Sequence, residues 1–484
     1  MIKRFIAILF SVCLLWVTPT FAATAKFTVL TLDDAILLAL RYNPNIRNAE
    51  VQRVIDKFNL RLAENRYEVQ YALTGSDNFA RTASAGAVSE GNTFTLTPQA
   101  QLLQSSYGTT ATLQAPSTIN QGNGLPRSFN PGITFSVTQP LLQGFGRNVN
   151  MIPLYNAQDA EITARLNLKN TIIQNVTSVI SQYTTLVQAT NTLKTLQLGL
   201  TNSITTLNQF RAQVKAGQKA AADLVQFQVT VANQQLSLQQ AQVALQTQQY
   251  ALLMLLGLNP NTLFSVTDDV TMGDMQIPTL DQSIRLALQH NIAYQQAIIA
   301  LRALHRQVLL AHDQTRPTLN LQVQQTQGSG LGNGSNANLP SLFNGQNGST
   351  SVGLSLTVPI SNLPARTAEV AARVALKQAE ITLSASKDQL VSNVSAAYYS
   401  LVSQKLQIDQ ANQALQLAGQ NLNIANVKLK YGKITPFEAS SLQTDLINAQ
   451  INYINTKTNY ISSLANFDQL LGTTTDRWQL QIRY

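Results

Sequence analysis

Residues 394–429, VSAAYYSLVSQKLQIDQANQALQLAGQNLNIANVKL, form the stretch that decides the fold. Apolar residues recur in it at intervals of seven: Val394, Leu401, Ile408, Leu415, Leu422 and Leu429. A seven-residue repeat keeps one apolar seam of a helix turned toward a neighbouring helix, as in coiled coils. The remaining positions are mostly Gln, Asn, Ser and Ala with few charges. Such a face suits packing against several neighbours or the lining of a water-filled conduit, the alternative being an ordinary solvated face.

The same pattern occurs earlier in the chain, so the sequence is an internal duplication. Subtracting 215 from each heptad position gives an earlier apolar set: Val179, Leu186, Leu193, Leu200, Leu207 and Val214. Four further landmarks also occur twice: Thr-Leu-Asp at 31 and 279, a proline at 140 and 359, glycine at 217 and 432, and Leu-Leu-Gly at 255 and 470. Repeats of this kind indicate two copies of one structural unit.

Each copy has the order helix, strands, very long helix, turn, long helix. We therefore predict a mixed, mainly α fold built from a duplicated unit. The predicted divisions are a signal peptide at 1–23, a first repeat at 24–257, a linker at 258–278 and a second repeat at 279–484. Strands are expected at about 67–141 and 317–360, and long helical hairpins at about 148–256 and 365–471. The single long helices at the start of the copies are expected at 32–66 and 280–314.

The strand segments alternate between apolar and uncharged polar residues. Val352, Leu354 and Leu356 alternate with Gly353 and Ser355, for example. This alternation is typical of transmembrane β-barrels, although a half-buried soluble sheet also shows it. We expect two strands per copy, which is too few to close a barrel, so the barrel must close by oligomerisation and three chains give about 12 strands. Residues 93–104 and 107–115 are also strand-like, and the sequence leaves open whether they are barrel strands or an extracellular hairpin.

The first 23 residues have the pattern of a cleaved secretory signal. Lys3 and Arg4 precede an apolar run at 5–17, and the small residues Ala22 and Ala23 follow it. A basic start, a short apolar core and small residues are what signal peptidases require. Export removes nucleic acid as a natural partner, and the net charge of +9 is scattered rather than clustered.

Little in the sequence favours an enzyme. The only cysteine, Cys13, lies in the signal segment, so we expect neither disulfide nor thiolate ligand after export. The three histidines, His290, His305 and His312, lack the i, i+3 or i+4 spacing of metal sites. We predict no catalytic residue, no metal and no cofactor. The competing class is a secreted coiled-coil filament of the flagellar rod or hook type, which usually lacks a cleaved signal.

At this point the chain resembles the TolC-type outer-membrane efflux proteins. The resemblance rests on the two Thr-Leu-Asp openings, the Thr138-Gln139-Pro140-Leu141 strand exit, the glycine turns and the two Leu-Leu-Gly ends, in one order repeated twice. It implies a homotrimer with a 12-stranded barrel in outer-membrane lipid, continuing into a 12-helix periplasmic tunnel. It also implies a tripartite or type I secretion system, in which a periplasmic adaptor and an inner-membrane pump of the RND or ABC type dock on the tunnel. The exported cargo would be drugs, small toxic molecules or proteins.

Two helix-turn-helix corners are the predicted periplasmic end. Asp223 and Glu438 lie six residues after Gly217 and Gly432, and three chains would arrange these acids as rings that gate the entrance. The alternative is that an acid there only complements the helix dipole. Relatives of this type carry acids at both positions, although this chain has Ser441 where a further acid is frequent.

Four residues at the corners and two prolines complete the candidate site. Lys219 and Lys433, beside Gly217 and Gly432, are candidates for adaptor contact, the alternative being solvated lysines. Pro140 and Pro359 mark the expected strand-to-helix corners, because proline is tolerated where a strand ends.

Overall fold

The computed structural model describes residues 29–84, 87–122, 125–216, 221–267, 277–328 and 348–480. The predicted signal peptide lies outside the described residues. The chain divides into two compact units. The first comprises residues 1–44, 175–276 and 401–465, and the second comprises 45–174, 277–400 and 466–484. Each unit therefore combines segments from both sequence repeats.

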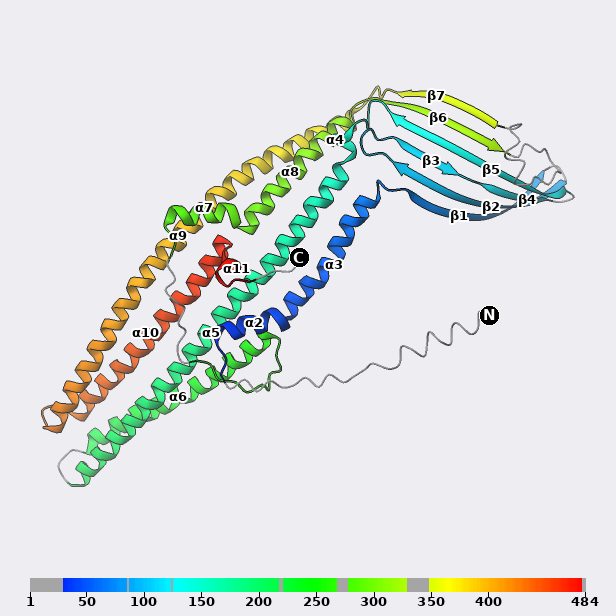
Figure 1. Ribbon diagram of the computed structural model, residues 1–484. Helices are drawn as coiled ribbons and strands as arrows, with labels where there is room; N and C mark the ends of the chain where they lie inside the picture. The colour runs from blue at the N-terminus through cyan, green and yellow to red at the C-terminus, as the bar shows by residue number, and fades with distance from the viewer. Residues whose placement is uncertain are drawn as a thin grey trace. The chain divides into compact units, whose positions relative to one another are not determined.

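Ten of the described elements are helices or helical turns, and Figure 1 labels them. The helices are α2 (Leu32–Tyr42), α3 (Pro44–Asn65), α4 (Arg147–Asn150), α5 (Ile152–Lys215), α6 (Ala221–Leu256), α7 (Leu280–His290), α8 (Ile292–Asp313), α9 (Leu363–Lys430), α10 (Pro436–Leu471) and α11 (Thr474–Arg477). The strands are β1 (Gln70–Ser84), β2 (Ala87–Leu103), β3 (Thr110–Gln114), β4 (Ser117–Gly122), β5 (Leu125–Pro140), β6 (Thr318–Gly328) and β7 (Gly348–Thr357).

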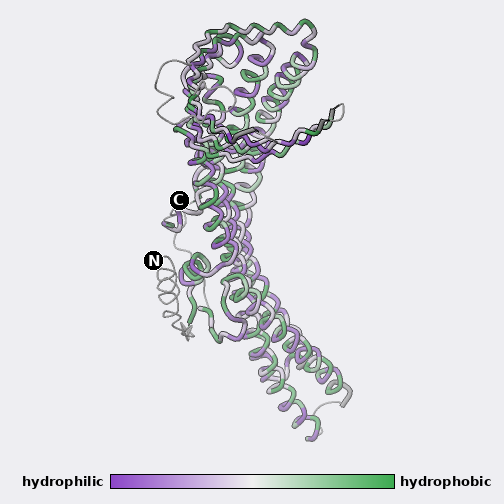
Figure 2. The backbone as a smooth tube through the Cα atoms, turned by 90° about the vertical axis from the view of Figure 1, so that its right-hand side faces the viewer, coloured by the Kyte–Doolittle hydropathy of each residue, from purple (hydrophilic) through white to green (hydrophobic). Residues whose placement is uncertain are grey.

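The first unit is a bundle of four long helical segments, and its core follows the heptad positions. Val179 and Leu186 of α5 and Leu401 of α9 are almost completely buried, and Leu252 of α6 is fully buried. Hydrogen bonds join α5 to both neighbours, since Gln182 of α5 contacts Gln248 of α6 and Gln188 of α5 contacts Asn455 of α10. The prediction that a seven-residue apolar seam packs these helices together is confirmed. Figure 2 shows hydrophobic and hydrophilic residues mixed along the described helices.

No helix within the described ranges combines the length and the apolar character that a bilayer crossing requires.

The expected single helices at 32–66 and 280–314 are wrong, because each is broken at an asparagine. Asn43 separates α2 from α3, and Asn291 separates α7 from α8. The side-chain amide of Asn43 donates to the carbonyl of Leu255 at 2.7 Å, and that of Asn291 donates to the carbonyl of Leu470 at 3.0 Å. An asparagine in extended backbone ends one helix and begins the next.

The glycines of the duplicated Leu-Leu-Gly ends pack against the helix breaks at Asn43 and Asn291. A Cβ on Gly257 would lie 2.3 Å from the carbonyl oxygen of Tyr42, and one on Gly472 would lie 2.3 Å from the carbonyl oxygen of His290. Both glycines also have positive φ. The close approach of two backbones therefore requires glycine, which explains why asparagine and glycine recur together in both copies.

The strands form one antiparallel sheet, ordered β1-β2-β3-β5-β6-β7, with β4 between β2 and β5 (Figure 1). β3 and β4 both pair with β2 on one side and with β5 on the other. The register is continuous from one to the other, because Gln99 faces Gln114 and, three residues along each strand, Leu96 faces Ser117. They are therefore two parts of one strand, interrupted near Pro116. The sheet has six strand positions, four of them from the first repeat. The expectation of two strands per copy is wrong for the first copy.

Candidate functional site

The sheet presents two chemically different faces. In an antiparallel pair, directly opposite residues point to the same side, so the register assigns every strand residue to a face. One side, the apolar face, contains large apolar residues from all six strand positions: Tyr71, Leu73, Phe94, Leu96, Leu113, Ile119, Phe135, Val137, Leu321, Val323, Val352 and Leu354. Many remain exposed within the chain, including Tyr71 at 81% and Val352 at 69%. So large an exposed apolar surface marks contact with lipid or protein.

The opposite side, the polar face, carries Thr, Ser, Asn and Gln. Examples are the directly opposed pairs Thr95 and Thr118, Thr112 and Ser136, and Gln324 and Ser351. Within the described parts of the strands, the polar face contains no Asp, Glu, Lys or Arg. An uncharged polar surface of this kind is stable against water and places no fixed charge in the path of a solute.

Charged residues on the apolar face begin at mid-height, where Asp77 faces Phe94 level with Phe129, and gather toward the end of the sheet that is distant from the helices. Arg81 and Glu90 form an ion pair there at 3.3 Å, and Arg127 lies on the same face of β5. Between this rim and the helical end, apolar residues of β5 continue from Phe129 to Val137. Eight residue steps of a strand cover about 27 Å, close to the apolar height of an outer-membrane barrel.

The strand-to-helix corners lie at the other end of the sheet. Pro140 is the last residue of β5 and faces Asn320 of β6, whereas Pro359 follows β7 and is exposed. After Pro140, the chain turns through Gly144, whose N–H donates to the carboxylate of Asp313 at 2.7 Å. The amide of Asn150 donates to the carbonyl of Gly144 at 2.8 Å. These bonds fix the exit of the chain from the sheet into α4 and α5.

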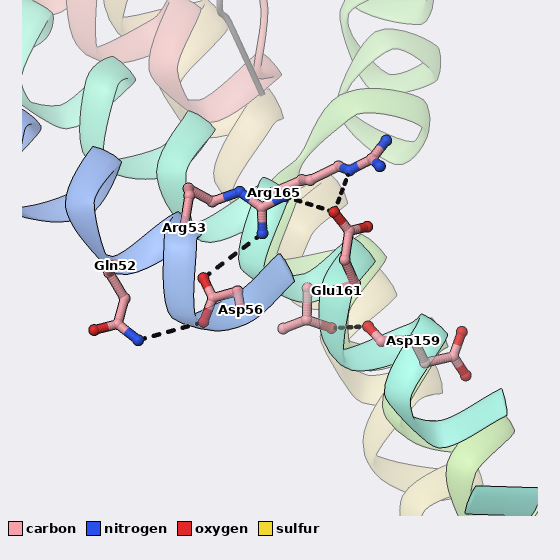
Figure 3. Close-up of polar contacts among 7 residues, drawn as sticks. Gln52, Arg53, Asp56, Asp159, Glu161 and Arg165 are labelled. Carbon is pink, nitrogen blue, oxygen red and sulfur yellow. Dashed lines mark hydrogen bonds and ion pairs between the residues drawn. The ribbon is translucent and has the colours of Figure 1, made fainter. Parts of the chain in front are cut away.

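Four helical segments of the second unit lie beneath the sheet and are joined at successive seams by ion pairs. Figure 3 shows the seam between α3 and α5, where Arg53 approaches Glu161 at 2.5 Å. Arg165 binds the same carboxylate at 2.7 Å, and Asp56 lies 3.6 Å from Arg53. Burial alone would raise the pKa of Glu161, but hydrogen bonds from Arg165 and Arg53 outweigh it and leave that pKa below the ordinary value.

The next two seams follow the same principle. Arg306 of α8 pairs with Asp159 of α5, and His312 of α8 pairs with Glu369 of α9 at 3.0 Å. The hydrogen bond from His312, together with one from Arg373, lowers the pKa of Glu369. The helices thus neighbour one another in the order α3, α5, α8, α9, and α3 and α9 are the two edges.

The described helix-turn-helix corner joins α9 to α10. Gly432 has φ +69°, its N–H donates to the carbonyl of Leu429, and the N–H of Lys433 donates to the carbonyl of Lys428. This arrangement is a Schellman motif, which explains the glycine. Glu438 accepts from the Thr435 N–H at 2.8 Å while its own N–H donates to the Thr435 hydroxyl, a capping box. Glu438 and Lys433 are both exposed.

The first corner is described only in part. Asp223 belongs to the first turn of α6, whereas Gly217 and Lys219 lie outside the described residues. Behind the corners, the four helices surround a cavity of about 30 Å³. Its polar lining comes from Asn202, Ser203, Thr206, Asn426, Ser440 and Gln443. That volume holds about one or two waters, which these side chains can bind.

Comparison with protein families identifies part of the chain. Residues 283–473 match the family described as outer membrane efflux protein. This part of the chain is similar to outer membrane efflux proteins. The match covers most of the second repeat, and the duplication extends the same architecture to the first. No curated protein sequence matches the chain significantly.

Solved structures of outer-membrane proteins and channels have the same fold over nearly the whole chain. The outer membrane protein VceC of Vibrio cholerae is 16% identical, with a TM-score of 0.66 and coverage of 91% of this chain and 96% of the other. The CmeC outer membrane channel of Campylobacter jejuni is 14% identical, with a TM-score of 0.66 and coverage of 92% of this chain and 86% of the other. The open-state MtrE outer membrane channel of Neisseria gonorrhoeae is 14% identical, with a TM-score of 0.65 and coverage of 92% of this chain and 89% of the other.

These matches confirm the resemblance to TolC-type efflux proteins and the predicted fold class. The similarity to this family locates the protein in the outer membrane, with its helical part in the periplasm. The family is one of transport proteins. Among the described side chains, no group of three or more His, Cys, Asp or Glu residues is arranged to hold a metal ion.

The ion pairs between α3, α5, α8 and α9 were not predicted from the sequence. The local signals for them were the i, i+4 spacings of Glu161 with Arg165 and of Glu369 with Arg373 on their helices. Arg53 is 108 residues from Glu161, and nothing local indicates that the two meet. His312 likewise meets an acid that is distant in the sequence, because the structure places it against Glu369 from another helix.

Proposed function

We propose that three copies of this chain assemble into a channel-tunnel that carries solutes from a periplasmic adaptor and inner-membrane pump across the outer membrane. Drugs, small toxic molecules or proteins are the cargo. The similarity to efflux proteins supports transport across this membrane, and the two faces of the sheet support a wall with lipid on one side and water on the other.

The single observation that carries the proposal is the pair of open sheet edges. β1 pairs only with β2 and β7 only with β6 among the described strands. Unpaired backbone N–H and C=O groups are too costly in lipid for a sheet edge to remain open. Because β1 and β7 end the same sheet, β7 of one copy can pair with β1 of the next and close a ring.

The two edge helices support the same assembly. α3 exposes Val51, Val54, Ile55, Phe58 and Leu62, and α9 exposes Val370, Val374 and Ile381. We call these two sets the edge stripes. Their spacings of three, four and seven are those of coiled-coil seams, and they lie on helices that precede β1 and follow β7. A second copy therefore covers helix and strand edges together.

The helix corners are the proposed entrance. Glu438, and Asp223 on the equivalent turn, would form acidic rings near the threefold axis, while Lys219 and Lys433 would contact the adaptor. The capping box of Glu438 accounts for this acid structurally, so its gating role is tested only by ion selectivity.

Two measurements on purified protein test the proposal. Mass determination in detergent should give three chains, and planar-bilayer recordings should show discrete conductance steps. Phe58→Glu, in the α3 edge stripe, should reduce trimer yield, whereas Asn59→Glu on an exposed neighbouring face should not. Monomeric protein that folds and inserts without conductance would refute the channel.

A further inference from the structure

The first repeat contributes an additional strand pair to the sheet. β2 pairs with β1 over 15 consecutive residues, from Gln70 facing Gln101 to Ser84 facing Ala87. The combined strand β3–β4 pairs with β5 over nearly the same height, from Thr110 facing Thr138 to Gly122 facing Leu125. Both added strand positions thus run from the helical end of the sheet to its rim, as β1 and β5 do.

The turn between β2 and β3 is fixed at the helical end. Gly108, in this turn, is buried, and a Cβ there would lie 2.6 Å from the carbonyl oxygen of Gly144 and 2.7 Å from the amide of Asn150. Tyr107 stacks on Phe145 at a centroid distance of 5.8 Å. The turn therefore packs on the strand-to-helix corner and cannot belong to an extracellular extension of the sheet.

The added strands have the same two faces as the others. Phe94 faces Ile119 and Ala100 faces Leu113 on the apolar face, whereas Thr95 faces Thr118 and Gln99 faces Gln114 on the polar face. A strand pair folded into a water-filled lumen would have no need for one continuous apolar side. The pattern is that of strands that cross the membrane.

The dimensions of the strands and helices agree with six strand positions per chain. Four neighbouring helices at 8–10 Å spacing cover an arc of about 32–40 Å. Strands 4.8 Å apart and tilted by about 40° cover about 6 Å each, so that six span about 37 Å and four only about 25 Å. Six strands therefore continue the wall of the helices α3, α5, α8 and α9 without a change of circumference.

We infer that the assembled barrel has 18 strands, six from each of three chains, rather than the 12 that the family resemblance implies. This inference rests on the proposed trimer. Barrel geometry then gives a backbone diameter of about 36 Å, against about 24 Å for 12 strands. The exit of such a barrel is wide and lined by uncharged Thr, Ser, Asn and Gln, so it restricts large or charged cargo less than a 12-stranded barrel does. Polypeptides are the class of cargo whose passage the wider exit favours most.

The first test locates the turn at 104–109. Ser106→Cys places a thiol in it, and a membrane-impermeant maleimide should label that thiol only after the outer membrane is permeabilised. Ala83→Cys, near the rim, is the matched control and should be labelled in intact cells. Labelling of Ser106→Cys in intact cells to the level of the control would overturn the inference.

The second test examines the added strands in the trimer. Spin labels at Leu113→Cys and Ile119→Cys should be accessible to oxygen dissolved in lipid, and labels at Thr112→Cys and Thr118→Cys to a water-soluble nickel complex. A trimer that conducts but shows water accessibility at all four positions would refute 18 strands while leaving the proposed function intact. A preparation that is not trimeric would refute both.

Discussion

The buried ion pair between Arg53 and Glu161 gives the sharpest energetic prediction. Both side chains are only about one-twentieth exposed, at 5% and 6%, and the pair joins α3 to α5 (Figure 3). Replacing Glu161 by Leu leaves the Arg53 guanidinium buried, and Asp56 at 3.6 Å is then its one ion-pair partner among the described residues. Removing one partner of a buried pair costs about 3–5 kcal/mol, because the remaining charge is uncompensated.

The double variant separates the ion pair from simple loss of packing. Arg53→Leu with Glu161→Leu removes both charges, and a buried pair replaced by apolar residues is often neutral in stability. We expect the double variant to recover most of the loss seen in Glu161→Leu. Arg165→Leu is the control, since Arg165 is half exposed and its ion pair contributes only about 0–1 kcal/mol.

Guanidinium unfolding of the detergent-solubilised protein, followed by helical circular dichroism, measures these differences between variants. A double variant as unstable as the sum of the two single variants would refute the reasoning, as would a Glu161→Leu variant within about 1 kcal/mol of wild type, the value for an exposed pair. Acidification provides a second check. Because the pKa of Glu161 is lowered on folding, its contribution is present at neutral pH and should be lost as the pH falls through that pKa.

Three further predictions concern other parts of the chain. In Gly432→Ala the added methyl group meets no neighbouring atom, so the variant loses only the strain of positive φ, about 1–2 kcal/mol of stability. In Gly472→Ala the methyl group also meets the backbone carbonyl of His290, so the same unfolding assay should show a loss at least about 1 kcal/mol larger. Equal losses in the two variants would contradict the close backbone contact described for Gly472. Burial raises the pKa of Asp468 to about 7, so wild type should lose stability as the pH rises through that value, and Asp468→Asn should not; parallel pH profiles would contradict this. Asp223→Ala combined with Glu438→Ala should weaken cation selectivity, measured as a reversal potential, while the trimer stays intact; unchanged selectivity would refute the acidic rings.

The long helices were predictable because their signal is local and repeated. Heptad residues such as Val394 and Leu401 are buried on the same seam, and the seven-residue spacing of apolar residues continues over several turns of the helix. The breaks at Asn43 and Asn291 were missed because helical periodicity continues across both. What interrupts each helix is a distant carbonyl, that of Leu255 or Leu470, which the sequence pattern does not reveal.

The number of strands was not predictable for a related reason. Alternation marks residues 93–104 and 107–115 as strand-like, but it does not say at which end of the sheet the connecting turn lies. That is decided by the packing of Gly108 on Gly144 and Asn150, which come from a corner about 40 residues later. The candidate gate shows the opposite limit, because the sequence identifies the turn glycine and the acid but cannot separate capping from gating.

The most direct test of the central claim is conductance of the purified protein in planar bilayers. The account predicts discrete, small steps, mostly independent of voltage, from preparations whose mass is that of three chains. Verified, folded trimers that insert and remain silent at every voltage would contradict the claim that this chain forms an outer-membrane conduit.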